Sequence, residues 1–442
     1  MKLKLTQAAS LSFLLVEPTV QTTWGSCLTI MPNLVASYEK MAGGPIRKID
    51  FGRHSTVVST LKAAQEIFAA APDVLVFIDH LKHPYELLKA LDFVYGRRPW
   101  PKLIIHVYGD FTLHTNSWKK SEALLVGRSV QFVTASPRQN DLISLFTKTP
   151  QGIVSVCPFP VSDTEYSFTE GLRERERTAR NYATDEFVMT YTGRLSLQKN
   201  IIKMIWEVAH AADKLKRPWR LQLAGAFDDL GSPFFSLQLR PNSYAEGVTK
   251  LVNSLPESFR QRIEFLGSLD KVQLRALYHA SDLFVSLSTH HDEDYGMSPI
   301  EALCCGCRVL ISDWGGFHGF GVDPLSTSFV PVSLRGRGPH LHTELLSEQL
   351  ERLSYEVETE DRRRERAEFY LENFGIAKVA AILAKVSGSM KTRFAGFSPA
   401  LKRHAKLMTN YRTTQSLFRT GARVDPNYRE FYETYIAPER RR

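Results

Sequence analysis

An alternation of short apolar runs with amphipathic stretches occurs twice along this chain, and it constrains the fold more than any other feature. In the first half, strands are expected at 13–16, 73–78, 103–107, 130–134 and 153–156. Helices are expected at 28–41, 58–70, 85–94 and 137–146. Apolar runs of this length between helical patterns are typical of a buried parallel sheet covered by helices.

The pattern stops at a segment, 163–185, that is rich in charge and poor in apolar residues, which indicates a linker. It then restarts, with strands expected at 187–191, 220–224, 263–266, 283–286, 308–311 and 329–330. Helices are expected at 201–214, 244–255, 271–279, 298–305 and 345–355, with a helical tail beyond. The sequence therefore predicts two parallel α/β domains in tandem. Ligands of such sheets bind at the carboxyl ends of the strands, so two facing domains would define one cleft.

Bulk composition agrees with this organisation. A length of 442 residues exceeds one ordinary core, and 43% hydrophobic with 23% charged residues is typical of a soluble globular protein. No apolar run approaches the roughly 18–20 residues that span a bilayer. The run from Leu11 to Val16 lacks a cleavage site after it, so we expect a buried strand rather than a secretion signal. Five cysteines are too few for a disulfide framework, and buried thiols in a reducing cytoplasm are expected.

The net charge of +9 is concentrated at the C-terminal end. Residues 391–442 hold 12 Lys and Arg against 4 Asp and Glu, a balance of +8, which leaves +1 for the rest. Either a solvated pair of terminal helices or an anionic partner, such as lipid or a polyanionic glycan, accounts for the excess. No nucleic-acid-binding motif accompanies it, so nucleic acid is not expected as a partner.

The segment 293–301, Glu-Asp-Tyr-Gly-Met-Ser-Pro-Ile-Glu, predicts a ligand site. Gly296 permits close approach of the backbone to a ligand, and Ser298 followed by proline predicts an N-cap and helix start. Amides at a helix start attract phosphate. Glu293 and Glu301 would flank that position, and carboxylates suit pairs of ligand hydroxyls.

A second group of candidates follows the first strand of the second half. Gly193 permits a tight exit from that strand, and Arg194 and Lys199 come where a ligand of a parallel sheet should bind. Two cations there could neutralise a diphosphate leaving group without a metal. Ordinary surface cations are the alternative, which the segment 293–301 disfavours.

Together these motifs resemble the donor domain of retaining GT-B glycosyltransferases, in particular glycosyltransferase family four. The matching pieces, in the family's order, are Thr192-Gly193-Arg194-Leu195 with Lys199-Asn200, Leu223-Ala224-Gly225, Phe265-Leu266-Gly267, residues 277–288, residues 293–303 and Gly306-Cys-Arg-Val309. Each piece is weak, but six in order over about 120 residues is a specific match. Arg308, where the family usually has proline, and the missing glutamate after Gly315-Gly316 are departures that carry no chemistry.

The resemblance implies a GT-B architecture, with two Rossmann-like parallel-sheet domains facing a central cleft and C-terminal helices. It implies an acceptor-binding domain, a linker, a nucleotide-sugar donor domain and a basic helical extension, at 1–165, 166–185, 186–375 and 376–442. The implied catalytic residues are Arg194 and Lys199 on the diphosphate and Glu293 on the sugar hydroxyls. The implied donor-binding residues are Glu301 on the ribose diol, with Gly193, Leu266, Gly267, Gly296, Met297 and Ser298.

The first domain resembles the family less closely. The strand at 103–107 leads to Tyr108-Gly109-Asp110, where the family usually places a histidine immediately before the glycine. His106 lies two residues earlier, so either His106 faces the acceptor or it is structural and Tyr108 lines the site. Asp110 is a further acceptor-side candidate, and so is Gly25, in the loop after the first strand.

These inferences predict a retaining transferase that moves a hexose-type unit from a nucleoside-diphosphate sugar to a hydroxyl acceptor, in cell-surface polysaccharide or glycolipid synthesis. It is expected to be cytoplasmic, with a peripheral position at the membrane, and to need no metal, because consecutive residues of the run His290–Asp294 rarely converge on one ion. Alternatives are a non-catalytic glycan- or nucleotide-binding subunit and a sugar-nucleotide epimerase or hydrolase. A nicotinamide dehydrogenase is disfavoured, since no Gly-x-Gly-x-x-Gly follows the first strand of either half.

Overall fold

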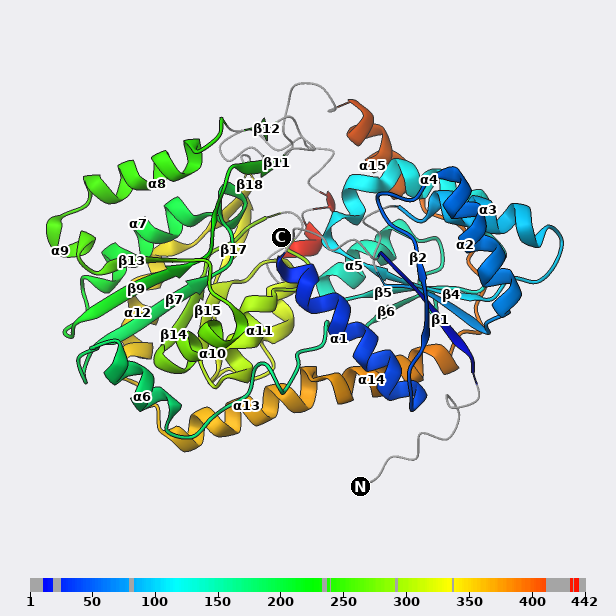
Figure 1. Cartoon of the computed structure of the whole chain (residues 1–442). Coiled ribbons are helices and arrows are strands. Elements are labelled where there is room, and N and C mark those ends of the chain that lie inside the picture. Colours follow the sequence, from blue (N-terminus) through cyan, green and yellow to red (C-terminus); the bar gives the residue numbers. More distant parts are fainter. Residues whose placement is uncertain are drawn as a thin grey trace. The chain divides into compact units, whose positions relative to one another are not determined.

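A computed structural model describes residues 11–18, 25–78, 83–232, 237–238, 240–290, 293–335, 338–410, 430–431 and 433–436 (Figure 1). The chain forms two compact units. The first comprises residues 1–160 and 373–410, and the second comprises 161–372 and 411–442. Each unit contains a six-stranded sheet in which every strand pair is parallel.

The sheet of the first unit has the order β2-β1-β3-β4-β5-β6. Its strands are β1 (Phe13–Glu17), β2 (Arg47–Asp50), β3 (Val74–Phe77), β4 (Lys102–Val107), β5 (Val130–Thr134) and β6 (Val154–Val156). Its helices are α1 (Gly25–Ala42), α2 (Val57–Ala70), α3 (Tyr85–Tyr95), α4 (Thr115–Leu125), α5 (Pro137–Phe146), α14 (Ile376–Gly388) and α15 (Pro399–Asn410). The turn η2 (Gly109–His114) follows β4.

The sheet of the second unit has the order β13-β9-β7-β14-β15-β16. Its strands are β7 (Phe187–Thr192), β9 (Trp219–Ala224), β13 (Ile263–Gly267), β14 (Leu283–Ser286), β15 (Arg308–Ser312) and β16 (Thr327–Val330). Three small pairs accompany it: β8 (Leu195–Ser196) with β10 (Phe227–Asp228), β11 (Leu230–Ser232) with β12 (Leu237–Gln238), and β17 (Val332–Arg335) with β18 (Gly338–Leu341).

The helices of the second unit are α6 (Leu172–Ala179), α7 (Ile201–Ala212), α8 (Ser243–Ser254), α9 (Glu257–Arg260), α10 (Lys271–Ala280), α11 (Met297–Cys304), α12 (Leu346–Tyr355) and α13 (Glu360–Phe374). Short turns are η3 (Leu197–Lys199), η5 (Gly315–Phe320), η6 (Thr343–Leu345) and η7 (Glu433–Tyr435). The predicted alternation of strands and helices is therefore confirmed in both units. β2 and α4 were not predicted from the sequence, because only Ile49 of β2 is buried and α4 is a mainly polar helix.

The segment 166–185 differs from the predicted linker, because α6 within it is bound tightly to the second unit. Arg173 and Arg177 donate to the two carboxylate oxygens of Asp282 at 2.6 and 3.1 Å. Burial alone would raise the pKa of Asp282, but the two arginines and the amide of Val188 hold it below its ordinary value. Charges that resemble a solvated run in the sequence thus pair with a buried carboxylate.

Residues 376–442 were predicted to form a basic helical extension after the donor domain, but the structure places residues 376–410 in the first unit. Helix α14 packs on α1, and α15 packs on α4 and α5, so residues 376–410 complete the first unit. The pattern of α15 explains this, since Leu401 and His404 are buried while Lys402, Arg403 and Lys406 are exposed. Most of the remaining basic tail lies outside the described residues.

All five cysteines are buried and free, as the sequence indicates. Among the residues that the structure describes, no helix is both long and apolar enough to cross a bilayer.

Candidate functional site

Three glycines mark successive strand ends in the second unit. Gly193 and Gly225, after β7 and β9, have φ of 137° and 147°, and a Cβ on Gly225 would lie 1.9 Å from the carbonyl oxygen of Gly193. Gly193 N–H donates to Ala224 (2.9 Å), and Gly225 N–H donates to Gly267 at the end of β13 (2.7 Å). Only glycine fits this close approach of backbones, so the glycines at 193 and 225 set the path of the loops that carry Arg194 and Lys199.

Lys199 and Glu293 form an ion pair at this edge of the sheet. Lys199 Nζ lies 2.9 and 2.7 Å from the two carboxylate oxygens of Glu293. The hydroxyl of Ser288, two residues after β14, donates to Glu293 Oε2 at 2.6 Å. Only 5% of Glu293 is exposed, so its charge is stabilised by these partners rather than by water. The structure therefore brings together two of the residues predicted from separate motifs.

The loop that carries Glu293 is held by residues that the sequence analysis did not select. The indole of Trp314 donates to the carbonyl of His290 (2.7 Å), and Gly316 N–H donates to the carbonyl of Glu293 (2.7 Å). A Cβ on Gly316 would lie 2.1 Å from the carbonyl oxygen of Asp294, so this position requires glycine. The pair Gly315-Gly316 was the available signal, but its contact with a loop 20 residues earlier was not visible in the sequence.

Arg194 also has a carboxylate partner. Its guanidinium donates to Asp228 Oδ2 at 2.6 Å and to Gln198 Oε1 at 2.9 Å. Asp228 lies on β10, which pairs with β8 just after Arg194. Asp228 is not recognisable as a site residue from the sequence, because the two-residue strand pair that places it has no periodic signal.

Helix α11 begins one residue earlier than predicted. Its cap position is Gly296, with φ of 110°, and no side chain caps it; Ser298 is therefore not the N-cap and lies in the first turn. A Cβ on Gly296 would lie 2.5 Å from the ring of Phe317. The glycine allows the chain to enter the helix at this angle, and the first amides, at Met297 and Ser298, have no acceptor within the helix.

Glu301 lies on α11 and is 5% exposed. Tyr278 donates a hydrogen bond to Glu301 Oε2 (3.4 Å), and Tyr278 and Thr192 hydroxyls lie 2.6 Å apart. Burial raises the pKa of Glu301 from 4.5 to about 7, although the Tyr278 hydrogen bond lowers it. Thr192 is the last residue of β7, so Glu301 is connected to the end of this strand through Tyr278. Glu293 is connected to the loop after the same strand through Lys199.

Leu266 and Gly267 end β13, which is an edge strand of the sheet. Leu266 is half-buried, and Gly267 is exposed with φ of 66°. The hydrogen bond from Gly225 joins Gly267 to the neighbouring strand end, which places both residues at the same edge as Gly193.

The acceptor-side candidates do not form one exposed group. His106 on β4 is 1% exposed and lies 2.8 Å from the hydroxyl of Tyr38, and burial lowers the pKa of His106 to about 3. Tyr108 is also buried, and its hydroxyl donates to the carbonyl of Ile78 (2.7 Å). His106 faces the side of the sheet that α1 covers and is a neutral residue of the core. Of the two alternatives, the structure therefore supports a structural role for His106 rather than a place in the acceptor site.

The remaining acceptor-side candidates are placed by backbone only. Gly25 is the first residue of α1, and Asp110 lies in η2, where its side chain is outside the described set. In the run His290–Asp294, residues 291–292 also lie outside that set.

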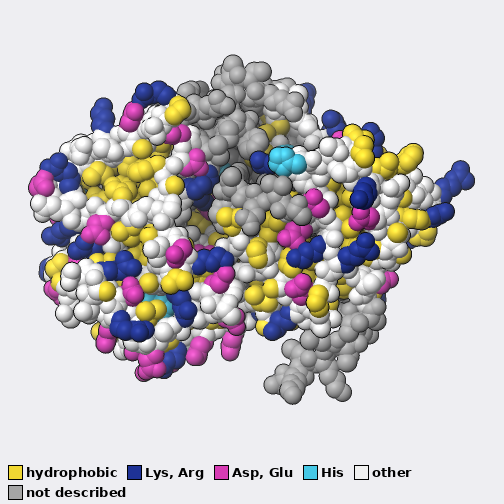
Figure 2. Space-filling model, viewed as in Figure 1, with side chains coloured by type: hydrophobic (Ala, Val, Ile, Leu, Met, Phe, Trp, Pro, Cys, Tyr) yellow, Lys and Arg dark blue, Asp and Glu magenta, His cyan; other side chains and the backbone are white. Residues whose placement is uncertain are grey.

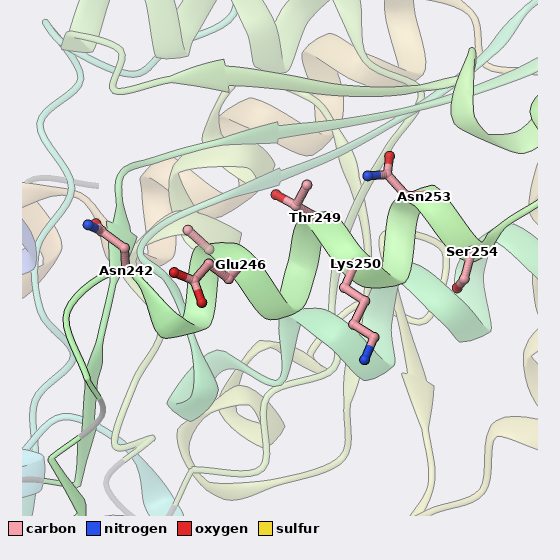
Figure 3. Close-up of a pocket in the computed structure, with 7 residues that line it drawn as sticks. Asn242, Glu246, Thr249, Lys250, Asn253 and Ser254 are labelled. Atoms are coloured by element: carbon pink, nitrogen blue, oxygen red, sulfur yellow. The ribbon is translucent and has the colours of Figure 1, made fainter.

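A separate shallow depression lies on α8, with Asn242 at its edge (Figure 3). Its lining side chains come from Asn242, Ala245, Glu246, Thr249, Lys250, Asn253 and Ser254. All belong to one helix and the residue before it, so within the described part of the chain no second element lines this depression. This depression does not gather groups for chemistry.

Two tandem parallel sheets, together with this arrangement of glycines, cations and glutamates, define a chain of the GT-B glycosyltransferase fold. The Anabaena protein HepE, solved in complex with UDP, has this fold: it matches with a TM-score of 0.63 and 14% identity over 86% of this chain and 100% of that structure. WaaG, a glycosyltransferase of lipopolysaccharide biosynthesis, matches with a TM-score of 0.54 and 12% identity over 85% of this chain and 99% of its own.

Residues 173–321, which lie in the second unit, match the family glycosyl transferases group 1, and the predicted resemblance to such glycosyltransferases is confirmed. D-inositol 3-phosphate glycosyltransferase of Gordonia bronchialis is 28% identical over 40% of this chain and 36% of its own length. Lipopolysaccharide 1,2-N-acetylglucosaminetransferase of Salmonella typhimurium is 25% identical over 52% and 54%, respectively. The chain thus spans about a third to half of the length of these curated relatives.

Proposed function

We propose that the second unit binds a nucleoside-diphosphate sugar and that the protein transfers the sugar to a hydroxyl acceptor with retention of anomeric configuration. The observation that carries this proposal is the Lys199–Glu293 ion pair, supported by Ser288. It joins the two halves of the predicted donor motif at the carboxyl ends of adjacent central strands, where parallel sheets bind ligands. The matches to UDP-bound HepE and to group 1 glycosyltransferases support the same class of donor.

In the proposed mechanism, Lys199 and Arg194 stabilise the negative charge that develops on the departing diphosphate. Each cation now contacts a carboxylate, at 2.7 Å for Lys199–Glu293 and 2.6 Å for Arg194–Asp228. These ion pairs fix both cations before the donor binds, which reduces the reorganisation that the leaving group requires. The amides at Met297 and Ser298 add hydrogen-bond donors for a phosphate at the start of α11.

The two glutamates have different proposed roles. Glu293, held by Lys199, accepts hydrogen bonds from hydroxyls of the transferred sugar. Glu301, which is buried and close to Tyr278, accepts hydrogen bonds from the ribose diol. The leaving phosphate assists attack of the acceptor hydroxyl on the same face of the sugar, so no covalent glycosyl-enzyme is required. Lys199 and Arg194 take the place of a metal ion at the diphosphate.

The test compares the wild-type protein with Lys199→Ala and Glu301→Ala. A thermal-shift panel of UDP, GDP, ADP and CMP sugars first identifies the donor, because a bound ligand raises the melting temperature. NMR of the products, with and without acceptor and with EDTA present, then reads the reaction. We expect a product with the anomeric configuration of the donor, and loss of turnover in both folded variants.

Other outcomes would identify the rival functions. Free sugar without acceptor would indicate a hydrolase, and an altered sugar nucleotide would indicate an epimerase. Donor binding without turnover under any acceptor would indicate a non-catalytic subunit. Wild-type rates in Lys199→Ala would remove the proposed role of the ion pair.

We further propose that the protein is cytoplasmic and works at an anionic membrane surface, in cell-surface polysaccharide or glycolipid synthesis. Basic and acidic side chains are interspersed on the face shown in Figure 2, whereas α15 exposes Lys402, Arg403 and Lys406 together. Lysines and arginines near such a surface contribute about 1 kcal/mol each to binding. Flotation with anionic and neutral vesicles should separate the wild type from the triple Glu variant of these positions, and equal recovery would contradict the proposal.

A further inference from the structure

The second unit contains another chemical cluster, on the hairpin β17–β18 and the turn η6. His340, His342 and Glu344 each present one ligand atom, and these atoms all lie within 4.8 Å of one another. We propose that these three side chains bind a divalent transition-metal ion such as Zn²⁺. The cluster contains none of the residues proposed for the donor site, so this inference is independent of the proposed function.

Strand geometry explains why the two imidazoles meet. Leu341, the last residue of β18, is 2% exposed and turns inward, so His340 before it points to the opposite, outer face. The ring of His342, which follows the strand, lies beside it, with the two ring centroids 5.1 Å apart. The backbone N–H of His342 donates to the carbonyl of Pro331 at 2.9 Å, which fixes the end of the hairpin. The tight turn η6 then carries Glu344 back beside His342.

The hydrogen bonds of His342 orient its ring toward Glu344. Its Nε2 lies 2.9 Å from the hydroxyl of Ser333, and its Nδ1 lies 2.8 Å from Glu344 Oε1. A metal ion would take the place of the proton at Nδ1, and the neutral ring would then carry its proton on Nε2 and donate it to the Ser333 hydroxyl. Such an outer contact to a ligating histidine is a common element of metal sites.

The spacing is close enough for small side-chain rotations to complete the site. Zinc bonds of about 2.0–2.1 Å in a tetrahedron place ligand atoms roughly 3.4 Å apart. His340 is half-buried and the Glu344 side chain is 61% exposed, so both have room to move inward. Three protein ligands leave a fourth position for water.

The ligand set selects the class of metal. Two imidazoles with one carboxylate favour Zn²⁺, Co²⁺, Ni²⁺ or Cu²⁺ over Mg²⁺ and Ca²⁺, which prefer oxygen ligands. Lys203 and Arg335 lie close enough to His340 to act on its charge, and their positive charges oppose a bound cation. We therefore expect micromolar binding rather than the tight binding of a structural zinc site.

Isothermal titration of the full chain, without an affinity tag and pretreated with chelator, tests the proposal. ZnCl₂ should bind one-to-one and MgCl₂ should give no heat. His340→Ala and Glu344→Gln should each weaken zinc binding by at least about tenfold, the effect that even outer-shell changes reach. His340 packs edge-on against the His342 ring, so its removal leaves the Ser333–His342–Glu344 hydrogen bonds in place.

His210→Ala is the matched control, because His210 is a surface histidine of α7 outside the cluster, and its zinc affinity should equal that of the wild type. The Co²⁺ complex should show visible d–d absorption without a thiolate charge-transfer band, which separates this site from the buried cysteines. Absence of one-to-one zinc binding would overturn the proposal, and so would unchanged affinity in both cluster variants with wild-type melting temperatures.

Discussion

Replacement of Glu301 by glutamine should stabilise the protein and weaken donor binding at the same time. Burial raises the pKa of this carboxyl from 4.5 to about 7, so the folded state retains a proton that the unfolded state has released. Stability therefore falls as the pH rises through the window between these values. Glutamine keeps the size of the side chain and an oxygen that can accept the Tyr278 hydrogen bond, but it carries no charge to bury.

The size of the effect follows from the two pKa values. Relative to a carboxyl with an unshifted pKa, Glu301 destabilises the folded state by about 1 kcal/mol at pH 5.5, where the folded protein keeps a proton that the unfolded chain releases, and by about 3 kcal/mol at pH 8, where the buried carboxyl is ionised. The advantage of Glu301→Gln should thus grow by about 2 kcal/mol between these pH values. For a unit of this size, that corresponds to roughly 4–8 °C in melting temperature.

Thermal unfolding at several pH values, followed by calorimetry, measures this difference. Glu351→Gln, at an exposed position of α12, is the control and should show no growth with pH. Titration of the donor nucleotide at pH 8 should show weaker binding to Glu301→Gln, because glutamine replaces one acceptor oxygen by an amide donor. A stability difference that is constant from pH 5.5 to 8 would refute the burial argument, and unchanged donor affinity would refute the ribose contact.

Three further predictions concern the same site. Ser288→Ala removes one of the hydrogen bonds to the Glu293 carboxylate. It should lower kcat/KM, measured with saturating acceptor, by an amount that corresponds to about 1–2 kcal/mol of activation free energy. Gly316→Ala places a Cβ against backbone and should lower the melting temperature and the donor affinity. The control is Gly247→Ala in helix α8, where the new Cβ would lie 3.6 Å from the Ile202 side chain; it should leave stability unchanged or raise it by up to about 1 kcal/mol. Asp228→Asn removes the charge that fixes Arg194 before the donor binds and should weaken nucleoside-diphosphate binding in calorimetry; unchanged or tighter binding would contradict the positioning role of this carboxylate.

Periodicity made most of the fold predictable because the strands are nearly all buried. β7 is buried along its full length, and such strands produce continuous apolar runs. Strand β2 was not predicted, because its sequence, Arg47-Lys-Ile-Asp, has one buried residue and the strand pairs only with β1 at the edge of the sheet. Helix α6 was not predicted for a different reason. Its half-buried Arg173 and Arg177 pair with the buried Asp282, about 100 residues away in the sequence, and local composition cannot reveal this contact.

The candidate site was predictable where the chemistry is carried by neighbouring residues. Glu293, Gly296 and Glu301 lie in one segment, and Arg194 and Lys199 lie in another, so each motif was visible by itself. Residues that act through long-range contacts were not, such as Gly316 against the Glu293 loop and Asp228 against Arg194. His106 was a candidate that the structure places in the core instead, since alternation along β4 does not reveal which face of the sheet a helix will cover.

The division of the first unit between residues 1–160 and 373–410 has a consequence for biosynthesis. Helix α14, whose Val379, Leu383 and Val386 are buried, packs on α1 and is translated more than 300 residues after it. While the second unit is being synthesised, the first lacks part of its core and exposes that apolar face. An N-terminal fragment cut at the apparent domain boundary would keep this exposed face permanently, so a soluble first unit requires residues 373–410 to be supplied with it.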